Sequence, residues 1–306
     1  MDRPCFTDQT GSPGAIPSDP NTVQGAGVPE QLSYCAGLVR RHDHDRFLTA
    51  LFAPEPVREH LWVLYAFNIE IARIRELVSE PLLGEIRLQW WREGIDAIYA
   101  GHGVRTHPVL EALEVAVRLC ALPRRPFDSL IDAHTESFSP NAPVNLEELE
   151  NHADAASAGV MRLAMGIAGG QAPDAAIRHA GIGWALTGVL RNIGIHASRR
   201  QVFLPGDMMR AEGLEPESVF SCRHGPELRR VMVSFAQIAG GHLAAARQAL
   251  PAPSRQIMPV LLPITLADIY LRQIRRPDHD PFRIAAPIPA FRRQARLLWA
   301  MLTKRF

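Results

Sequence analysis

The sequence predicts an all-α fold, a single-domain helical bundle around a central cavity, and three observations lead to this prediction. Apolar residues recur with a period near 3.6 in almost every stretch after about Pro29. Alternating β-branched runs of useful length are missing, and no Asn-Gly or Asp-Gly turn joins two such runs. Apolar stripes such as that of residues 55–78 are wide enough for burial on several sides, which is typical of helices around a core or cavity.

The expected elements follow from their boundary signals. Residues 1–28 are rich in Pro, Gly, Ser and Asn and predict a disordered N-terminal arm, so the helical domain is expected over residues 29–306. Pro56 and Pro81 suit the first turns of two helices, and Gly101 marks the end of the second. Clusters of Pro and Gly separate the other helices. Helices are expected over residues 30–52, 55–78, 81–100, 107–121, 126–138, 146–169, 173–198, 225–250, 257–276 and 288–304.

Charge and composition exclude several classes of protein. The 33 basic and 32 acidic residues give a net charge of +1, which argues against an overall basic nucleic-acid binder. The four cysteines show no metal-ligand spacing, no run of about 18 apolar residues is present, and residues 1–28 lack the apolar segment of a secretion signal. We therefore expect a cytoplasmic protein. Lys304 is the only lysine, so any phosphate site must use guanidinium groups.

Two helical segments carry most of the chemical information. They contain Tyr65, Ala66 and Phe67 in the first, and Leu190, Arg191, Gly194, Arg199, Arg200, Val202, Leu204 and Pro205 in the second. In these residues the chain resembles the squalene/phytoene synthase family, and the resemblance covers roughly residues 30–306. It implies a helical bundle of the isoprenoid synthase type. It also implies two facing helices with acidic residues spaced i, i+4, which hold Mg²⁺ ions against the substrate diphosphates.

The acidic positions of these motifs are largely replaced. By alignment to the family framework, the first pair falls on Ala72 and Glu76, and the second on Asn192 and His196. Arg73 adds a fixed cation beside the first pair, and such a charge repels a divalent metal ion. We therefore predict no metal site, no cofactor and no ordinary Mg²⁺-dependent activity. Mg²⁺ is expected only if the chain is an active synthase.

Further segments resemble one branch of the family, which contains the mitochondrial complex I assembly factor. These segments are residues 38–48, 65–72, 78–81, 86–92 and 198–205. The resemblance implies an assembly factor for respiratory complex I, with a complex I subunit or assembly intermediate as partner and without nucleic acid. It also implies a prenyl or quinone-like lipid as candidate ligand. The expected location is peripheral on the bacterial inner membrane, or the matrix face in a eukaryote.

Two alternatives stay open. One is an active prenyl transferase of the squalene/phytoene synthase type, which uses prenyl diphosphates at a remodelled metal site. Its site would combine Glu76, Asn192 and His196 with Arg73 and Arg191. The other is a structural bundle without a ligand. Loss of the paired aspartates favours the assembly factor over the transferase.

Individual side chains also have competing interpretations. The resemblance implies a set that binds the anionic head group of a ligand: Tyr65, Arg73, Arg191, Arg199 and Arg200. The alternative for these arginines is ion pairing at helix ends, and Arg73 and Glu76 are expected to pair at i, i+3 in place of the metal. His196 is interpreted as a packed histidine of the bundle. The tract at residues 42–45 is interpreted as a solvated helix face, because adjacent helical residues point in different directions.

The C-terminal segment combines aromatic and basic residues. Residues 287–306 contain Phe291, Trp299 and Leu302 among several arginines. A basic helix with aromatic residues on one face can lie on an anionic membrane surface. The alternative is a terminal helix that docks on the bundle and has a basic outer face. Both interpretations hold if the end of the helix is exposed.

Overall fold

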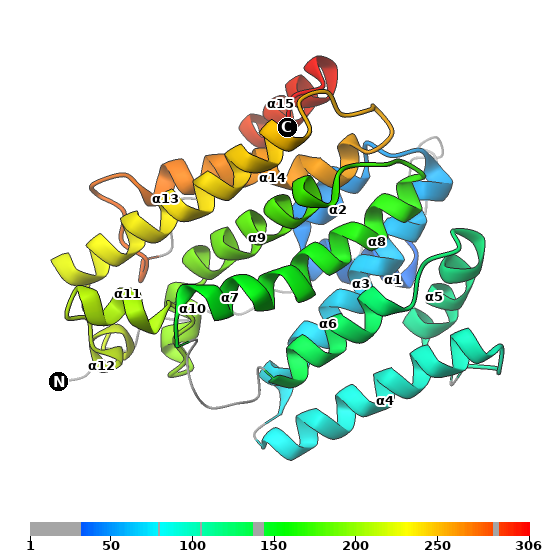
Figure 1. The fold of residues 1–306 in the computed structure, drawn as a ribbon, viewed down its shortest axis with the longest axis horizontal. Coiled ribbons are helices and arrows are strands. Elements are labelled where there is room, and N and C mark those ends of the chain that lie inside the picture. Colours follow the sequence, from blue (N-terminus) through cyan, green and yellow to red (C-terminus); the bar gives the residue numbers. More distant parts are fainter. Residues whose placement is uncertain (1–31, 79, 105, 137–143, 284–287) are drawn as a thin grey trace, which may run out of the picture.

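The structure, a computed structural model, describes residues 32–78, 80–104, 106–136, 144–283 and 288–306, and every regular element in these ranges is a helix (Figure 1). The all-α prediction is confirmed, while the arm predicted for residues 1–28 lies outside the described residues. The elements are α1 (Tyr34–His42), α2 (His44–Ala50), α3 (Glu55–Leu77), α4 (Pro81–Ala100), α5 (Pro108–Leu119), α6 (Arg125–Glu136), α7 (Leu146–Ala153), the π-helix η1 (Asp154–Ala158), α8 (Gly159–Ala168), α9 (Asp174–Arg191), α10 (Ile193–Ser198), α11 (Gly206–Ala211), α12 (Pro216–Phe220), α13 (Pro226–Ala249), α14 (Met258–Ile274) and α15 (Ala290–Thr303).

The interior of the bundle is formed above all by α3 and α14. Residues 61–67 of α3 are buried without interruption, and so are residues 257–267 at the start of α14. A helix on a surface would show an exposed face in each turn, so neighbours surround these stretches on all sides. Phe67 packs edge-on against Trp91 of α4 and Phe127 of α6, with 5.5 Å between ring centroids in both pairs. The burial on several sides that the sequence predicts for α3 is confirmed.

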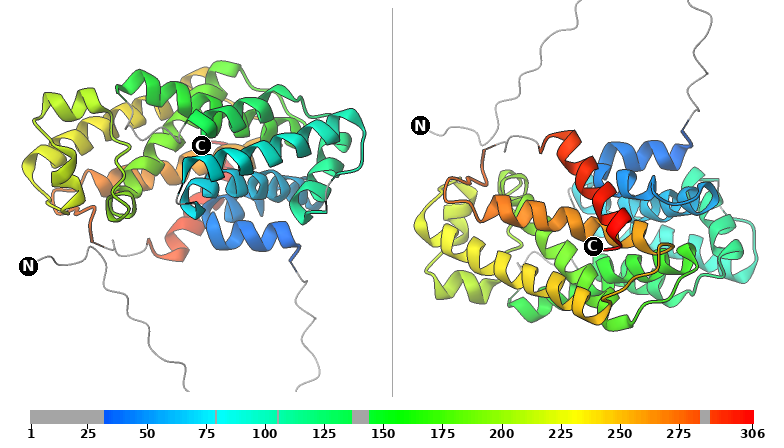
Figure 2. Two further views of the ribbon diagram at one scale, coloured as in Figure 1. Left: turned by 90° about the horizontal axis from the view of Figure 1, so that it is seen from below. Right: turned by 90° about the horizontal axis from the view of Figure 1, so that it is seen from above.

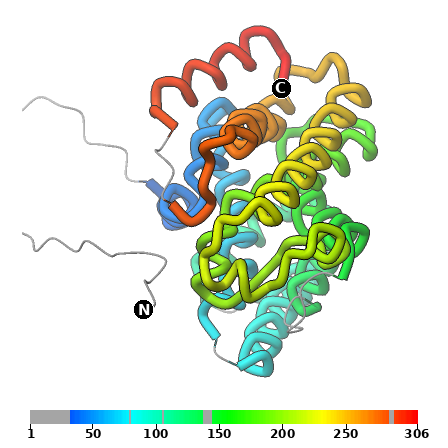
Figure 3. Tube along the Cα trace, turned by 90° about the vertical axis from the view of Figure 1, so that its left-hand side faces the viewer, coloured from blue at the N-terminus to red at the C-terminus, as the bar shows by residue number. Residues whose placement is uncertain are grey.

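The other helices surround this interior. α9 packs against α13, α14 and η1, and α3 packs against α1, α5 and α8. The last helix, α15, packs on α14 and crosses its outer side, as the right-hand view of Figure 2 shows. α15 and α4 lie at opposite ends of the molecule (Figures 1 and 3). Within the described ranges, no helix has the length and apolar character needed to cross a membrane.

The structure divides the predicted helices at two places and adds short helices at a third. The helix predicted for residues 30–52 breaks at Asp43, whose carboxylate accepts a hydrogen bond from the Arg46 N–H at 3.0 Å and caps α2. The helix predicted for residues 173–198 breaks at Asn192, between α9 and α10. The stretch between the helices predicted for residues 173–198 and 225–250 contains α11 and α12. Burial of an apolar side chain in each of these short helices stabilises them despite the surrounding Pro and Gly.

Candidate functional site

The first family motif lies on the last turns of α3, where Ala72 and Glu76 are exposed. Oε1 of Glu76 lies 2.8 Å from Nη1 of Arg199, the residue that ends α10. Arg73 instead reaches α1, where its Nη1 lies 3.2 Å from Nε2 of His42. A guanidinium only donates, so His42 accepts here, and burial together with the Arg73 charge lowers the pKa of His42. In the structure Glu76 therefore pairs with Arg199 rather than with Arg73.

The second family motif spans the break between α9 and α10. The N–H of His196 donates to the carbonyl of Asn192 at 2.8 Å, so the two motif residues remain one turn apart. The His196 ring packs edge-on against Phe203, with 4.6 Å between centroids, and the Arg75 guanidinium lies 5.1 Å from the centroid of Phe203. Burial, followed by the charge of Arg199, lowers the pKa of His196 to about 4. At neutral pH this position therefore holds a packed, uncharged ring.

Arg191, predicted to bind an anion, faces a carboxylate of the protein itself. Its Nη1 lies 3.0 Å from Oδ2 of Asp45, and its guanidinium stacks 3.7 Å from the ring centroid of Tyr270. The hydroxyl of Tyr270 lies 2.8–2.9 Å from both carboxylate oxygens of Asp45 and donates to them. Nη1 of Arg293 completes the cluster at 3.5 Å. Asp45 is only 5% exposed, so side chains from α9, α14 and α15 converge on a buried carboxylate of α2, while Arg191 itself reaches solvent.

The Asp45 cluster (Asp45, Arg191, Tyr270 and Arg293) has the chemistry of an oxyanion site with its acceptor already in place. Two guanidinium groups and a phenol are donors that suit a phosphate, but here they converge on an aspartate. Burial is the main cause that raises the pKa of Tyr270 to about 12, so its hydroxyl keeps the donor proton. An exogenous anion would have to displace the Asp45 carboxylate to reach these donors.

Tyr65 belongs to the core beside this cluster. Its ring is 3% exposed, and the guanidinium of Arg46 lies 5.2 Å from the ring centroid. Arg46 also pairs with Asp43 at 3.4 Å. Burial raises the pKa of Tyr65 to about 12, so its hydroxyl stays protonated. Tyr65 therefore packs α3 against α2 through a cation–π contact.

The structure does not bring the three predicted binding arginines of the second motif together. Arg191 points to Asp45 and Arg199 points to Glu76, whereas Arg200 turns to α12. The φ angle of Arg200 is 52°, a left-handed conformation that sends the chain out of α10. Its Nη2 lies 2.9 Å from a carboxylate oxygen of Glu217. Each guanidinium therefore has a separate carboxylate.

The sequence interpretation of residues 42–45 as a solvated face is wrong for Asp45 and for the cap at Asp43. The helix break at Asp43 turns Asp45 inward, where α9, α14 and α15 supply its partners. Tyr270 and Arg293 were not among the predicted site residues. The one local sequence signal for a buried charge was Asp45-Arg46-Phe47, in which two charged residues precede an aromatic residue. In the structure all three are buried.

The donor set at the four motif positions does not fit a pair of Mg²⁺ ions. Ala72 offers no donor, Asn192 a neutral amide and His196 a ring packed on an aromatic side chain. Mg²⁺ requires hard oxygen ligands, usually carboxylates, and the only carboxylate here is engaged by Arg199. In the part of the chain that the structure describes, no group of three His, Cys, Asp or Glu residues is placed to hold a metal ion.

Known proteins similar to this chain fall into two groups. The family model described as squalene/phytoene synthase matches residues 39–301. A Bos taurus protein named NADH dehydrogenase (ubiquinone) complex I, assembly factor 6, is 31% identical over 276 residues, which cover 90% of this chain and 81% of the bovine one. A phytoene synthase of Thermus thermophilus is 27% identical over 288 residues, covering 88% of this chain and 92% of that one.

The fold also matches solved structures of synthases. A crystal structure of a dehydrosqualene synthase in complex with a ligand aligns with a TM-score of 0.76 at 16% identity. The alignment covers 89% of this chain and 95% of that chain. The predicted helical bundle of the isoprenoid synthase type is thereby confirmed.

Proposed function

This chain belongs to the squalene/phytoene synthase family, and we propose that within the family it is an assembly factor for respiratory complex I, the NADH:quinone oxidoreductase. The likeness to the bovine assembly factor over most of both chains supports this function. The protein then works by binding a complex I subunit or an assembly intermediate, without a catalysed reaction and without a metal cofactor.

The observation that carries the proposal is the charge at the old motif positions. Only Glu76 remains of the four carboxylates that the family pattern implies, and Arg199 pairs with it at 2.8 Å. Arg73 adds a further guanidinium group on the same helix end, where it contacts His42. A second cation there disfavours divalent metal ions, because like charges at close range repel one another. The Asp45 cluster supports the same conclusion, since its carboxylate holds Arg191.

The expected place of action is the surface of the membrane that contains complex I. The protein would lie peripherally on the inner membrane of a bacterium, or on the matrix face in a eukaryote. A prenyl or quinone-like lipid in the bundle stays a prediction. Extraction of purified protein with organic solvent, followed by mass spectrometry, checks it by the presence or absence of such a lipid.

Deletion of the gene tests the proposed function. We expect the amount of assembled complex I, measured on native gels and by NADH:quinone oxidoreductase activity of membranes, to fall several-fold. Reintroduction of the gene with Glu76→Gln should restore assembly, because the single remaining motif carboxylate has no catalytic task. An undiminished complex I in the deletion strain contradicts the proposal.

A direct assay distinguishes the alternative function, a prenyl transferase, from the assembly factor. Purified protein is incubated with Mg²⁺ and farnesyl or geranylgeranyl diphosphate, and products are extracted and identified. We expect no squalene, phytoene or precursor above a control without protein. Turnover that Glu76→Gln abolishes would establish a remodelled catalytic site and end the binding-protein proposal as the sole function.

A further inference from the structure

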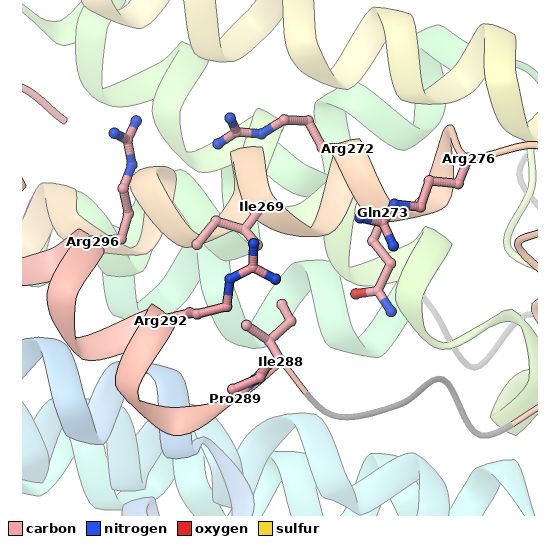
Figure 4. A pocket seen from close by; sticks show the side chains of 8 residues that line it. All are labelled: Ile269, Arg272, Gln273, Arg276, Ile288, Pro289, Arg292 and Arg296. Carbon is pink, nitrogen blue, oxygen red and sulfur yellow. The ribbon is translucent and has the colours of Figure 1, made fainter.

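A groove lined by arginines separates α14 from α15. Its volume is about 500 Å³, and Figure 4 shows the side chains that line it. Arg272 and Arg276 come from α14 and the turn after it, and Arg292 and Arg296 come from α15. Ile269 and Ile288 are among the apolar side chains beside them. We call this feature the arginine groove.

The arginine groove concentrates positive charge without a carboxylate of its own. None of its four arginines forms an ion pair with a described acidic residue. Asp268, one turn from Arg272, is held by Arg247 at 2.7 Å, and Arg272 donates only to the Asp268 carbonyl. The Nε of Arg296 has no acceptor, and its guanidinium stacks 5.0 Å from a Trp299 ring centroid. Figure 4 shows these guanidinium groups spread along the groove, with those of Arg272 and Arg296 turned away from Ile288, and like charges along one groove attract an anion because they otherwise repel one another.

An exposed apolar stripe lies beside the groove on α15. Phe291, Leu298 and Leu302 are 70%, 54% and 74% exposed. Their spacing of seven and four residues puts them on one face of the helix. Leu297 and Ala300 are buried and attach a different face of α15 to the bundle. The sequence alternative of a docked helix with a basic outer face is therefore only half right, because this helix docks and its outer face is apolar.

α15 has buried apolar side chains on one face and exposed apolar side chains on another, so the exposed face needs an apolar partner outside the bundle. A helix that only covers the bundle would present polar residues to water, whereas contiguous apolar residues next to charges mark a binding surface. Phe291, Leu298 and Leu302 form the apolar stripe, Trp299 lies at its edge against Arg296, and the groove arginines follow. This order matches the two layers of a membrane surface, acyl chains and phosphates.

We propose that α15 docks on an anionic membrane, with its apolar stripe in the interface and a lipid phosphate in the arginine groove. This inference rests on the proposed work at the membrane of complex I and names the surface that makes the contact. Guanidinium groups bind phosphate oxygens through paired hydrogen bonds, so the groove selects anionic over zwitterionic lipid by its excess charge. Docking through α15 leaves α4, at the opposite end of the molecule, turned away from the membrane (Figure 3).

Vesicle binding by the full chain tests this proposal. One set of vesicles contains phosphatidylcholine alone, and the other contains equal parts of phosphatidylcholine and phosphatidylglycerol. We expect cosedimentation with the second set only, weakened by added salt. Arg276→Gln with Arg292→Gln should lower the affinity about 25-fold, since each basic residue near an anionic surface contributes roughly fivefold. Leu298→Ser with Leu302→Ser should lower it at least about tenfold through lost apolar insertion.

Matched controls remove the same chemistry elsewhere. Arg87→Gln with Arg223→Gln deletes two exposed arginines away from α15, and Leu82→Ser with Leu83→Ser deletes two exposed leucines on α4. Both controls should bind vesicles like the unchanged protein. Equal losses in the controls, or unchanged binding of the α15 variants, would overturn the proposal. All these side chains are exposed, so circular dichroism should report the same helical content throughout.

Two further measurements distinguish a lipid in the arginine groove from a soluble anion or a protein. If inorganic phosphate protects the protein thermally while the leucine variant on α15 keeps full vesicle binding, the groove is a site for soluble anions and the membrane proposal falls. If the arginine variant keeps vesicle binding and loses a complex I intermediate in affinity purification, the groove binds protein instead. Vesicle binding needs no complex I, so a failed vesicle assay with normal rescue of the deletion strain rejects only this inference.

Discussion

The motif region at the ends of α3, α9 and α10 and the arginine groove between α14 and α15 both gather arginines, but these arginines face different partners. In the motif region Arg191 pairs with the buried Asp45, and Arg199 pairs with Glu76. In the arginine groove no described carboxylate pairs with any of the four arginines. Arg191 and Arg199 thus have counter-charges inside the protein, whereas the groove arginines have none among the described residues.

This difference indicates that the motif region now serves the fold, whereas the surface at α15 serves binding. The family pattern places metal ions and diphosphates at the motif region, yet this chain fills that region with its own carboxylates, an aromatic ring and an uncharged histidine. A guanidinium that already has a carboxylate partner stabilises the fold and binds little else. The surface at α15 therefore is the better place to look for an external anionic partner.

Removal of the Asp45 carboxylate is expected to have the largest effect, and it tests whether Asp45 neutralises the arginines around it. Asp45→Asn leaves Arg191 and Arg293 without their buried counter-charge; because Arg191 is 36% exposed, we expect a loss at the lower end for such pairs, about 3 kcal/mol in the free energy of unfolding. Chemical denaturation measures it. The matched control is Glu217→Gln, which breaks an exposed pair with Arg200 and should cost at most about 1 kcal/mol. Equal costs would mean that Asp45 does not neutralise this cluster.

Acid should weaken the bundle near the motif region, while the groove contains no histidine to titrate. Burial, with smaller effects of His152 and Arg75, lowers the pKa of His134 to about 3, against a usual value of 6.5. The unfolded chain therefore binds a proton that the folded chain rejects, so stability is full above pH 6.5 and falls as pH decreases towards 3. At pH 5 the loss from His134 alone is about 2 kcal/mol.

Urea denaturation at pH 7 and pH 5 measures this loss. His134→Gln, which cannot gain a proton, should show a smaller difference between the two pH values than the unchanged protein. The same pH difference in both proteins would show that His134 is not the group responsible.

Binding of inorganic diphosphate tests whether the Asp45 carboxylate occupies the donors of the Asp45 cluster. With Asp45 in place, diphosphate should not raise the melting temperature through this cluster. In Asp45→Asn the donors of Arg191, Tyr270 and Arg293 become available, and a diphosphate concentration ten times the dissociation constant would stabilise the variant by about 1.4 kcal/mol. Stabilisation of the unchanged protein that persists when the groove arginines are replaced would contradict internal occupation by Asp45.

The smallest effect is expected at the remaining motif carboxylate. Glu76 and Arg199 are both more than 40% exposed, so Glu76→Gln should change the free energy of unfolding by less than about 1 kcal/mol. Differential scanning calorimetry at low and high salt measures this change, and salt should reduce it further. A larger loss would mean that the motif region depends on this pair more than its exposure implies.

The fold was accessible from sequence because its signals are local. The apolar period of α3, the prolines that open α3 and α4 and the glycine at position 101 each act within a few residues, and the structure shows helices where they predict them. The family could be predicted because its framework residues survive around Tyr65 and Arg191. The break at Asp43 was missed because its side-chain cap competes with helix continuation, and the bundle around it decides between them. Asn192 makes no such cap, and no local signal marks the break there.

The sequence by itself determined the all-α class, the family and the loss of three motif carboxylates, since each follows from the identity of residues at known spacings. Only the tertiary structure decided what the arginines face. Arg191 and Asp45 are separated by 146 residues, and Arg293 and Asp45 by 248, so no local pattern predicts that they meet. The sequence shows the aromatic and basic character of residues 287–306, but the arginine groove emerges only after α14 and α15 pack together, because burial, pairing and exposure are properties of the assembled bundle.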